Sequence, residues 1–238
     1  MKLIEPLRSA CLLGALVLAV GGCSSTGGLG RGSGGLGGRG SLARNAANLG
    51  IRVDLIPEGR YGRHLKRPMR PRFITVHATE TYGSSANAAT MARALRNGNL
   101  TATHNLLGYL TWHFSVDQGS VYQSLPLNER GEHADYEGQG NKESIGIEMC
   151  ENRGNSITAT VDRTAKLCAV LMAEYGIPLQ NVVPHYHWEQ IRPRTGKNLG
   201  HKSCPHFLMD NGKPGAKWQG FLRKVDGYSK QLKRTGRA

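Results

Sequence analysis

The sequence predicts a mixed α/β fold, a single domain in which a central mixed β-sheet is flanked by helices. Two observations lead to this prediction. Short stretches of β-branched and apolar residues, typical of buried strands, alternate with longer stretches whose apolar residues recur at helical spacing. The chain shows no internal repeats, and its 238 residues leave room for one domain with a sizeable core after an N-terminal region of different composition.

The chain begins with a segment that resembles a bacterial export signal. Basic residues precede an apolar stretch at residues 11–20, which is too short for a membrane-spanning helix of about 20 residues. The letters VGGC at 20–23 resemble a lipobox, which implies removal of residues 1–22 and acylation of Cys23. Ser24, in place of an aspartate, favours anchoring in the outer membrane, facing the periplasm. An ordinary cleaved signal peptide is the alternative.

Residues 23–45 are predicted to be a flexible tether, because glycine dominates the stretch 27–40 and such a composition buries no core. The folded domain is then expected at 46–238. The formal net charge of +14 favours anionic partners such as cell-wall polymers or lipid headgroups. No nucleic-acid-binding signature is present, so nucleic acid is not expected as a partner. The oligomeric state stays open.

Four stretches have the apolar, β-branched composition of strands. A segment at residues 60–72, crowded with arginine, lysine and proline, precedes the first of them and is expected to be solvated. The letters DQG at 117–119 separate the second stretch from the third and are typical of a β-hairpin. The predicted strands are residues 72–77, 111–116, 120–124 and 144–149.

Three helices are predicted from apolar residues at helical spacing. Ser84 or Ser85 is the expected N-cap of the first, and Gly176 is expected to end the second. The basic residues after position 229 are expected to form a loose tail. The predicted helices are residues 84–97, residues 160–175 and a last helix that includes Trp218, Phe221, Leu222 and Val225.

Histidine and cysteine side chains occur where predicted strands end. His77 closes the first strand. His185 and His187 follow another short apolar stretch, and Cys204 comes soon after. Two imidazoles and one thiolate, with a fourth position open, are what a catalytic zinc site requires. The pattern predicts a site for one Zn²⁺ ion at strand ends, although a single strand-end histidine is more often a packed or surface residue.

The five cysteines divide by position. Cys11 leaves with the signal peptide and Cys23 takes the lipid, which leaves Cys150, Cys168 and Cys204 in the domain. An odd number excludes a closed disulfide framework. Whether Cys150 and Cys168 pair stays open, while Cys204 has the chemical surroundings of a bound thiol.

Six stretches occur in the order found in the zinc amidase family that includes phage T7-type lysozymes, bacterial N-acetylmuramoyl-L-alanine amidases and animal peptidoglycan recognition proteins. The chain resembles this family from about residue 73 to residue 207. The resemblance implies hydrolysis of the amide bond between N-acetylmuramic acid and L-alanine, with peptidoglycan as the substrate. The stretches are ITVHAT (74–79), TWHF (111–114), GEHA (131–134), SIGIE (144–148), VPHYH (183–187) and KSCP (202–205).

The resemblance also implies roles for individual residues. It makes His77, His185 and Cys204 the zinc ligands. His187 is the rival of His185, which is favoured because it directly follows the Val-Val-Pro stretch, as the family's second ligand does. Lys202, two residues before the metal cysteine, matches the family's catalytic lysine.

Glu148 matches the acidic residue with which several bacterial members activate water. It would take the water's proton and pass it to the leaving nitrogen, while Lys202 would stabilise the oxyanion. His133 matches a histidine that lines the substrate groove. Trp112 stands where the phage enzymes have a tyrosine, which shifts catalytic weight to Glu148 and leaves Trp112 as a substrate-binding residue. His113 is expected to be a packed strand histidine rather than a partner of the site.

Three alternative functions use the same residues. Receptors of similar sequence bind peptidoglycan without hydrolysing it, but they lack the metal cysteine that this chain has at Cys204. Glycosidases need paired carboxylates, and Glu148 stands alone. A cysteine peptidase would use Cys204 as its nucleophile, yet Pro205 follows it and no helix N-terminus is evident to lower the thiol pKa. Residues 189–201 could cover the site or touch the glycan, and the preference for intact wall or fragments stays open.

Overall fold

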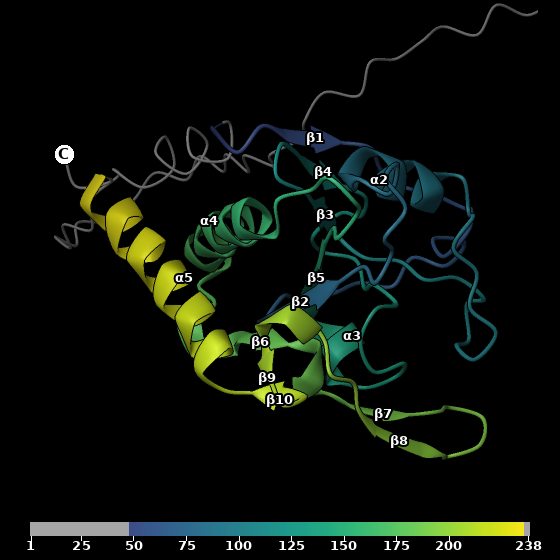
Figure 1. Ribbon diagram of the computed structural model, residues 1–238. Helices are drawn as coiled ribbons and strands as arrows, with labels where there is room; N and C mark the ends of the chain where they lie inside the picture. The colour runs from purple at the N-terminus through teal and green to yellow at the C-terminus, as the bar shows by residue number, and fades with distance from the viewer. Residues whose placement is uncertain (1–47, 236–238) are drawn as a thin grey trace, which may run out of the picture. The chain divides into compact units, whose positions relative to one another are not determined.

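Figure 1 shows the computed structural model, which describes residues 48–235. The predicted signal peptide at 1–22 and the tether at 23–45, with the proposed lipidation site Cys23, lie outside the described residues. None of the helices within residues 48–235 is both long and apolar enough to cross a lipid bilayer.

A six-stranded mixed sheet, in the order β1-β4-β3-β5-β2-β6, lies at the centre of the fold. β2 is parallel to both of its neighbours, β5 and β6. β3 runs parallel to β5 and antiparallel to β4, and β1 completes the edge parallel to β4. The predicted fold class is therefore confirmed. The strands are β1 (Ile51–Val53), β2 (Phe73–Ala78), β3 (Phe114–Val116), β4 (Val121–Gln123), β5 (Ser144–Met149) and β6 (Val182–Pro184).

Helices cover both faces of the sheet (Figure 1). α4 (Ile157–Tyr175) and α5 (Ala216–Thr235) pack together on one face, where Leu167 and Phe221 share the larger core with Ile147. α2 (Ala88–Arg96) lies on the other face and buries Met91 and Leu95 in a second cluster. The short α3 (Gln139–Glu143) leads directly into β5.

Several short elements follow β6. β7 (Glu189–Ile191) and β8 (Asn198–His201) form a hairpin that extends from the domain in Figure 1, and β9 (Met209–Asp210) pairs with β10 (Lys213–Pro214). The residues between 189 and 201, which the sequence left without a structure, are this hairpin. The 3₁₀ turns in this part of the chain are η1 (Leu179–Asn181), η2 (His185–His187) and η3 (His206–Leu208).

The predicted strands at 72–77 and 144–149 are β2 and β5, each within one residue of its predicted bounds. Both strands are almost entirely buried, and their core residues Ile74, Val76, Ile145 and Ile147 alternate with residues of the opposite face, which carries His77 and Glu148. The predicted hairpin is also present, as β3 and β4, although both strands are shorter than predicted. Its turn is held by the Asp117 carboxylate, which accepts hydrogen bonds from the backbone N–H groups of Gly119 and Ser120.

Three boundary predictions are wrong because the capping and packing residues lie elsewhere. α2 begins at Ala88, where the Asn87 side chain accepts the N–H of Thr90 at 3.0 Å, so neither Ser84 nor Ser85 is the N-cap. α4 begins earlier than predicted, with Ser156 as its cap. The basic C-terminal residues are helical up to Thr235, because the buried face of α5 continues through Ser229.

The sequence predicted that the basic segment at 60–72 is solvated, and this prediction is wrong for two of its arginines. Arg63 is buried and forms a bidentate ion pair with Glu129, at 2.8 Å for each bond. Arg67 forms an ion pair with Glu132, which is also buried. Both guanidinium groups meet a carboxylate, which offsets the loss of water, and only the Arg63 pair has the matching bidentate geometry.

Cys150, Cys168 and Cys204 are all free and buried. Cys168 belongs to the larger core, whereas Cys150 belongs to the second cluster with α2. The two thiols therefore lie in separate parts of the interior, and no disulfide joins them.

Candidate active site

The site lies where three parallel strands end. His77 is the penultimate residue of β2 and pairs in register with Glu148 of β5. β6 ends at Pro184, and His185 opens the 3₁₀ turn that follows it. Because β2, β5 and β6 run in the same direction, their carboxyl ends bring these three side chains to one edge of the sheet.

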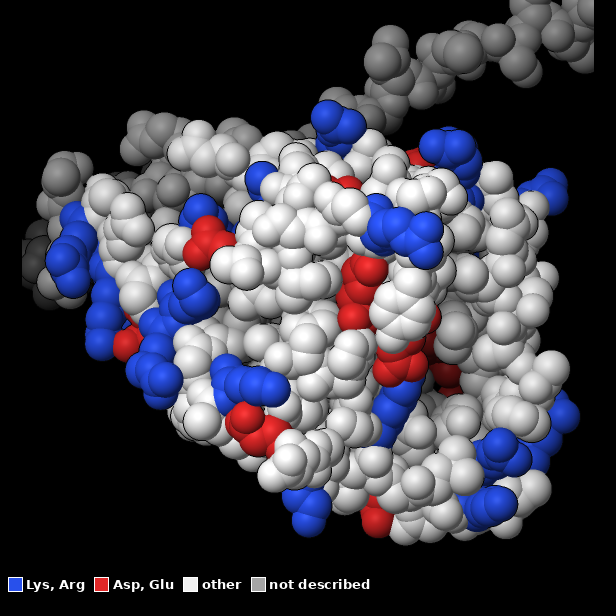
Figure 2. Space-filling model, viewed as in Figure 1, with Lys and Arg blue, Asp and Glu red and all other residues white. Residues whose placement is uncertain are grey.

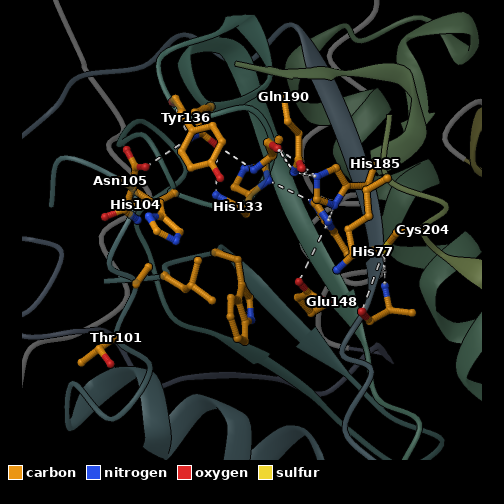
Figure 3. Close-up of a pocket in the computed structure, with 18 of the residues that line it drawn as sticks. His77, Thr101, His104, Asn105, His133, Tyr136, Glu148, His185, Gln190 and Cys204 are labelled. Atoms are coloured by element: carbon orange, nitrogen blue, oxygen red, sulfur yellow. Dashed lines mark hydrogen bonds and ion pairs between the residues drawn. The ribbon is translucent and has the colours of Figure 1, made fainter. Parts of the chain in front are cut away.

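Cys204 reaches the same edge from the segment after β8. Its Sγ accepts a hydrogen bond from the backbone N–H of Ala78 at 3.3 Å, which fixes the sulfur beside the end of β2. Ligand atoms of His77, His185 and Cys204 all lie within 4.8 Å of one another, and all three residues are buried. Figure 3 shows them gathered with His133 and Glu148 on one side of the hollow. The structure therefore brings together the three residues that the sequence proposed as ligands.

His187, the rival of His185, takes no part in this cluster. Its side chain is exposed, and its ring packs against Phe73 and Trp188 with centroid distances of 6.3 and 4.6 Å. The turn η2 separates the two histidines, so that only the ring of His185 faces the ends of β2 and β5.

The two clustered histidines have their Nδ1 atoms facing each other, 2.9 Å apart. Their other ring nitrogens are engaged elsewhere. His77 Nε2 lies 3.0 Å from His133 Nδ1, and His185 Nε2 donates to the carbonyl oxygen of Ala134 at 2.9 Å. Metal-binding histidines use their second nitrogen in this way, because the outer hydrogen bond fixes the ring and leaves the first nitrogen as a ligand.

Burial favours the neutral form of both imidazoles. It lowers the pKa of His185 to about 4 and that of His77 well below its usual value, and the neighbouring His185 lowers the pKa of His77 further. A neutral imidazole has the free lone pair that a metal ligand needs. Burial also raises the pKa of the Cys204 thiol, so this sulfur needs a bound cation to be present as the thiolate.

Glu148 faces the cluster from β5. Its Oε1 lies 4.0 Å from His77 Nδ1, and its buried Oε2 has no hydrogen-bond partner among the described residues. Burial raises the pKa of Glu148 to about 8, while the nearby Lys202 acts in the opposite direction. A carboxylate with an uncommitted oxygen in this position has the capacity to accept a proton.

Lys202 lies at the rim, half-exposed, with its Nζ 3.1 Å from Glu80 Oε2. Glu80 is itself held by Glu151, whose carboxylate accepts the Glu80 N–H at 2.9 Å. Burial lowers the pKa of Lys202, but the Cys204 sulfur and the Glu80 carboxylate outweigh it and raise the pKa overall. Lys202 is therefore a stable cation beside the cluster. Figure 2 shows acidic side chains grouped near the middle of the face in view, whereas basic ones crowd the side where α5 lies.

A hollow of about 480 Å³ opens over the cluster. His133 and Trp112, both predicted to bind substrate, belong to its lining. His133 has an Nε2 atom without a partner among the described residues. Trp112 is buried and its indole Nε1 donates to Ser115 Oγ at 2.8 Å, so it offers ring surface to the hollow and no free donor. The opposite side carries Thr101, His104, Asn105 and Tyr136 (Figure 3).

His113 is a packed histidine, as predicted, although it precedes β3 and is not itself a strand residue. Its Nε2 lies 2.8 Å from the carbonyl oxygen of Glu129, and its Nδ1 accepts the N–H of Gly146 at 3.0 Å. Both ring nitrogens are therefore committed to backbone, and the residue does not line the hollow.

Two polar residues of the site were missed from the sequence. Gln190 of β7 lines the hollow and donates to the Ala134 carbonyl at 3.0 Å, beside His185. Asn141 of α3 accepts the N–H groups of His133 and Ala134 with one side-chain oxygen, at 2.9 and 2.8 Å. The sequence allowed residues 189–201, which include Gln190, to lie over the site. Asn141 lies in a polar stretch with no sequence pattern that indicates a place in the site.

Comparison with known proteins agrees with this geometry. The family profile described as N-acetylmuramoyl-L-alanine amidase matches residues 67–207. XlyA of Bacillus subtilis (strain 168), an N-acetylmuramoyl-L-alanine amidase, is 38% identical over 179 residues, which cover 75% of this chain and 52% of XlyA. CwlH of the same strain, also an N-acetylmuramoyl-L-alanine amidase, is 34% identical over 187 residues, with 78% and 64% covered. The chain thus spans about half to two thirds of the length of these relatives.

Solved structures show the same relationship. The catalytic domain of XlyA is similar with a TM-score of 0.59 and 39% identity, covering 74% of this chain and 98% of that one. A mutant endolysin from Bacillus subtilis gives a TM-score of 0.60 and 39% identity, with 74% and 97% covered. With the family profile matched across the strands that carry the site, this chain belongs to the N-acetylmuramoyl-L-alanine amidase family.

Proposed function

We propose that this chain uses one zinc ion to hydrolyse the amide bond between N-acetylmuramic acid and L-alanine in peptidoglycan. The observation that carries the proposal is the convergence of three buried ligand atoms, from His77, His185 and Cys204, beside the uncommitted carboxylate of Glu148. Membership of the family and the activities named for the Bacillus subtilis relatives support peptidoglycan as the substrate.

The donor set fits zinc. Two imidazole nitrogens and one thiolate are typical of zinc, whereas magnesium and calcium prefer oxygen ligands. The hydrogen bonds from His185 to the Ala134 carbonyl and from the Ala78 N–H to the Cys204 sulfur orient two of the ligands from behind. His187 faces away and is not proposed as a ligand.

Zinc held by these residues supplies a Lewis acid that polarises the scissile carbonyl and acidifies a water molecule. Glu148 takes the proton of the attacking water and delivers it to the departing nitrogen, work typically worth about 10²–10⁴-fold in rate. Lys202, paired with Glu80 at the rim, stabilises the negative charge that develops on the carbonyl oxygen.

His133 and Trp112 are proposed to contact the substrate. Both residues line the hollow: the His133 Nε2 atom itself is buried, so His133 offers its ring surface, and the Trp112 ring gives the hollow an apolar wall. Asn141 holds the His133 side of the lining in place, because its side-chain oxygen accepts the backbone N–H groups of His133 and Ala134.

The N-terminal segment adds a second part to the proposal. Acylation of Cys23 would anchor the protein, through the tether at 23–45, in the outer membrane facing the periplasm. Metabolic labelling with a radioactive fatty acid tests this part: the wild-type chain is expected to incorporate label and Cys23→Ala is not. A labelled Cys23→Ala variant, or an unlabelled wild type that is exported, contradicts the anchor.

The enzymatic part is tested with the purified chain on muropeptides and on sacculi, with mass spectrometry of the products. The wild type is expected to release stem peptides beginning with L-alanine and to contain one zinc per chain by elemental analysis. Cys204→Ala and His77→Ala should lose both metal and product, because each removes a ligand. Glu148→Gln should keep the metal and lose roughly 10²-fold or more in turnover.

His187→Ala is the matched control, because it removes a nearby histidine that lies outside the cluster. It should keep both zinc and activity. Wild-type turnover by Cys204→Ala would contradict the site. A wild type that binds zinc and sacculi but releases no product would instead show a receptor, the non-catalytic alternative on this fold.

A further inference from the structure

A second hollow, here called the basal hollow, lies at the opposite end of the sheet from the candidate active site. Its volume is about 860 Å³. Its lining includes Arg72, Glu143 and Asn181, which immediately precede the parallel strands β2, β5 and β6. The candidate active site lies at the carboxyl ends of the same strands. Since β2 has six residues at about 3.3 Å each, the two sites are separated by roughly 20 Å.

The basal hollow is strongly cationic. Four of its lining side chains are basic and one is acidic: Arg70, Arg72, Arg130, Lys142 and Glu143. Glu143 Oε2 lies 3.6 Å from an Arg72 nitrogen, so the single carboxylate is already shared. Within residues 48–235, Arg70 and Lys142 form neither an ion pair nor a side-chain hydrogen bond, and both are exposed. These two cations are therefore free to meet an anionic ligand.

Hydrogen bonds join the segments that form the walls of the basal hollow. The Arg72 N–H donates to the Glu143 carbonyl at 2.8 Å, and the Asn181 side chain donates to the Arg72 carbonyl at 2.8 Å. On the other side, Arg130 Nε donates to the Pro68 carbonyl at 3.3 Å. The ring of Tyr175, at the end of α4, is exposed beside them and adds an apolar surface. The carbonyl end of α4 contributes only a partial negative charge, which is too small to neutralise the surrounding cations.

We propose that the basal hollow is a second peptidoglycan-binding site, which takes the carboxylates of an intact stem peptide while another stem peptide is cleaved at the opposite end of the sheet. This inference rests on the proposed function, because it assumes the same polymer as substrate. Guanidinium groups match carboxylates in charge and planar geometry, and Tyr175 offers a face for the apolar parts of the peptide.

A polymer is needed to use both sites at once. A soluble muropeptide carries too few stem peptides to bridge roughly 20 Å, whereas a sacculus presents many on one mesh. Binding at the basal hollow therefore raises the local concentration of the enzyme on polymeric wall and leaves hydrolysis of small fragments unchanged. Phosphate headgroups of a lipid surface share the anionic chemistry, but a planar bilayer meets only the rim of a concave site.

The test uses the full-length chain with Arg70→Gln and Lys142→Gln combined. These side chains have no partner in the described fold, so their loss should leave thermal unfolding unchanged. The matched control is Arg223→Gln with Lys224→Gln, which removes the same charge from the exposed face of α5. Binding to sacculi stripped of phosphate polymers is measured in the Glu148→Gln background, so that the wall is not digested. Turnover is measured separately, with Glu148 intact in each protein, on sacculi and on a soluble muropeptide.

The basal variant is expected to bind sacculi roughly tenfold more weakly, since each exposed ion pair contributes a factor of a few and the two act together. Its turnover on the muropeptide should equal that of the wild type, and the α5 control should lose less than twofold in binding. Amidation of the wall carboxylates should weaken the wild type to the level of the basal variant. Arg70→Lys with Lys142→Arg should restore binding.

Equal losses in the basal variant and the α5 control would show a general charge effect and overturn the proposal. Loss of binding to vesicles of anionic phospholipid, with sacculus binding intact, would assign the hollow to a lipid surface and equally overturn it. The proposed function fails separately: a wild type that binds sacculi through the basal hollow but cleaves neither substrate keeps the second site and loses the amidase activity.

Discussion

Buried histidines in this protein differ in what their ring nitrogens contact. His113 commits both nitrogens to backbone groups, whereas His77 and His185 each keep Nδ1 toward a common point. Histidine is thus a structural residue at position 113, just before β3, and a ligand candidate at position 77, near the end of β2. The difference arises from position in the fold. His77 and His185 lie where β2 and β6 end, whereas His113 precedes β3 and is enclosed by the backbone of Glu129 and Gly146.

His113 should make the fold sensitive to acid. Burial lowers its pKa to about 4 from an ordinary 6.5, because a charged ring at this position would be removed from water. A protonated ring would also lose the hydrogen bond that Nδ1 accepts from the Gly146 N–H. The unfolded chain therefore binds more protons between these values. The contribution of His113 to stability is full above about pH 6.5 and is lost as pH falls toward about 4, a total of roughly 2–4 kcal/mol.

Urea unfolding of the metal-free chain between pH 7 and pH 4 measures this effect. His113→Gln, which cannot titrate, should be less stable at pH 7 but show a shallower loss on acidification. Other buried histidines contribute in the same direction in both proteins, so the difference between the two slopes isolates His113. Parallel slopes would contradict the assignment.

At this scale, the sequence could identify residues whose backbone position determines their surroundings. His77 and Glu148 end buried strands that pair in register, so their proximity follows from the strand pattern. The choice between His185 and His187 needed the η2 turn, which sequence does not reveal. Gln190 donates to the carbonyl of Ala134, a residue far away in the sequence, and such a long-range contact has no local pattern.

Strands that are almost entirely buried were the easiest elements to predict. In β2 and β5 the core residues recur at every second position, because one face of each strand packs into the larger core. Helix ends were harder, because a cap is a single hydrogen bond that several neighbouring residues can supply. α2 uses Asn87 where two serines stood nearby, while the end of α4 was predictable because Gly176 adopts a backbone conformation that favours glycine.

The end of α4 gives a prediction at this scale. Gly176 caps the helix with φ of 65°, and a Cβ added there would meet nothing within 4 Å. Gly176→Ala should therefore destabilise the fold by roughly 1 kcal/mol through backbone strain alone. Gly227, inside α5, also has open space where a Cβ would be added but keeps an ordinary helical φ, so Gly227→Ala should stabilise by about 0.5–1 kcal/mol.

Denaturant unfolding of the two variants beside the wild type measures both changes. Their opposite signs make the pair informative, because the substitution is identical and neither site has a steric conflict. A stabilised Gly176→Ala would mean that α4 ends without the left-handed cap. A destabilised Gly227→Ala would mean that the C-terminal part of α5 is not helical.

The molecule as a whole uses the two ends of one sheet for different chemistry. Metal-binding and proton-accepting groups lie at the carboxyl ends of β2, β5 and β6, and unpaired cations lie at their amino ends. The net charge of +14 indicated an anionic partner. That several of the basic side chains gather in one hollow at the amino ends of the strands depends on the strand order of the sheet. Composition gives the attraction, and only topology gives its position.

Zinc should contribute to the stability of the whole domain, because the three ligand atoms converge only when β2, β6 and the segment after β8 are folded together. A ligand that binds the native state alone stabilises it by about 2.7 kcal/mol at a free concentration of 100 times its Kd. For a domain of this size each 1 kcal/mol shifts Tm by roughly 2–4 °C, so zinc should raise Tm by roughly 5–11 °C over the chelated protein. Differential scanning calorimetry measures the shift without any substrate.

His187→Ala should show the full increase, and His77→Ala and Cys204→Ala should show none, because each lacks one of the converging ligands. Equal Tm values with zinc and with chelator would show that the cluster does not bind the metal, whatever the activity of the enzyme.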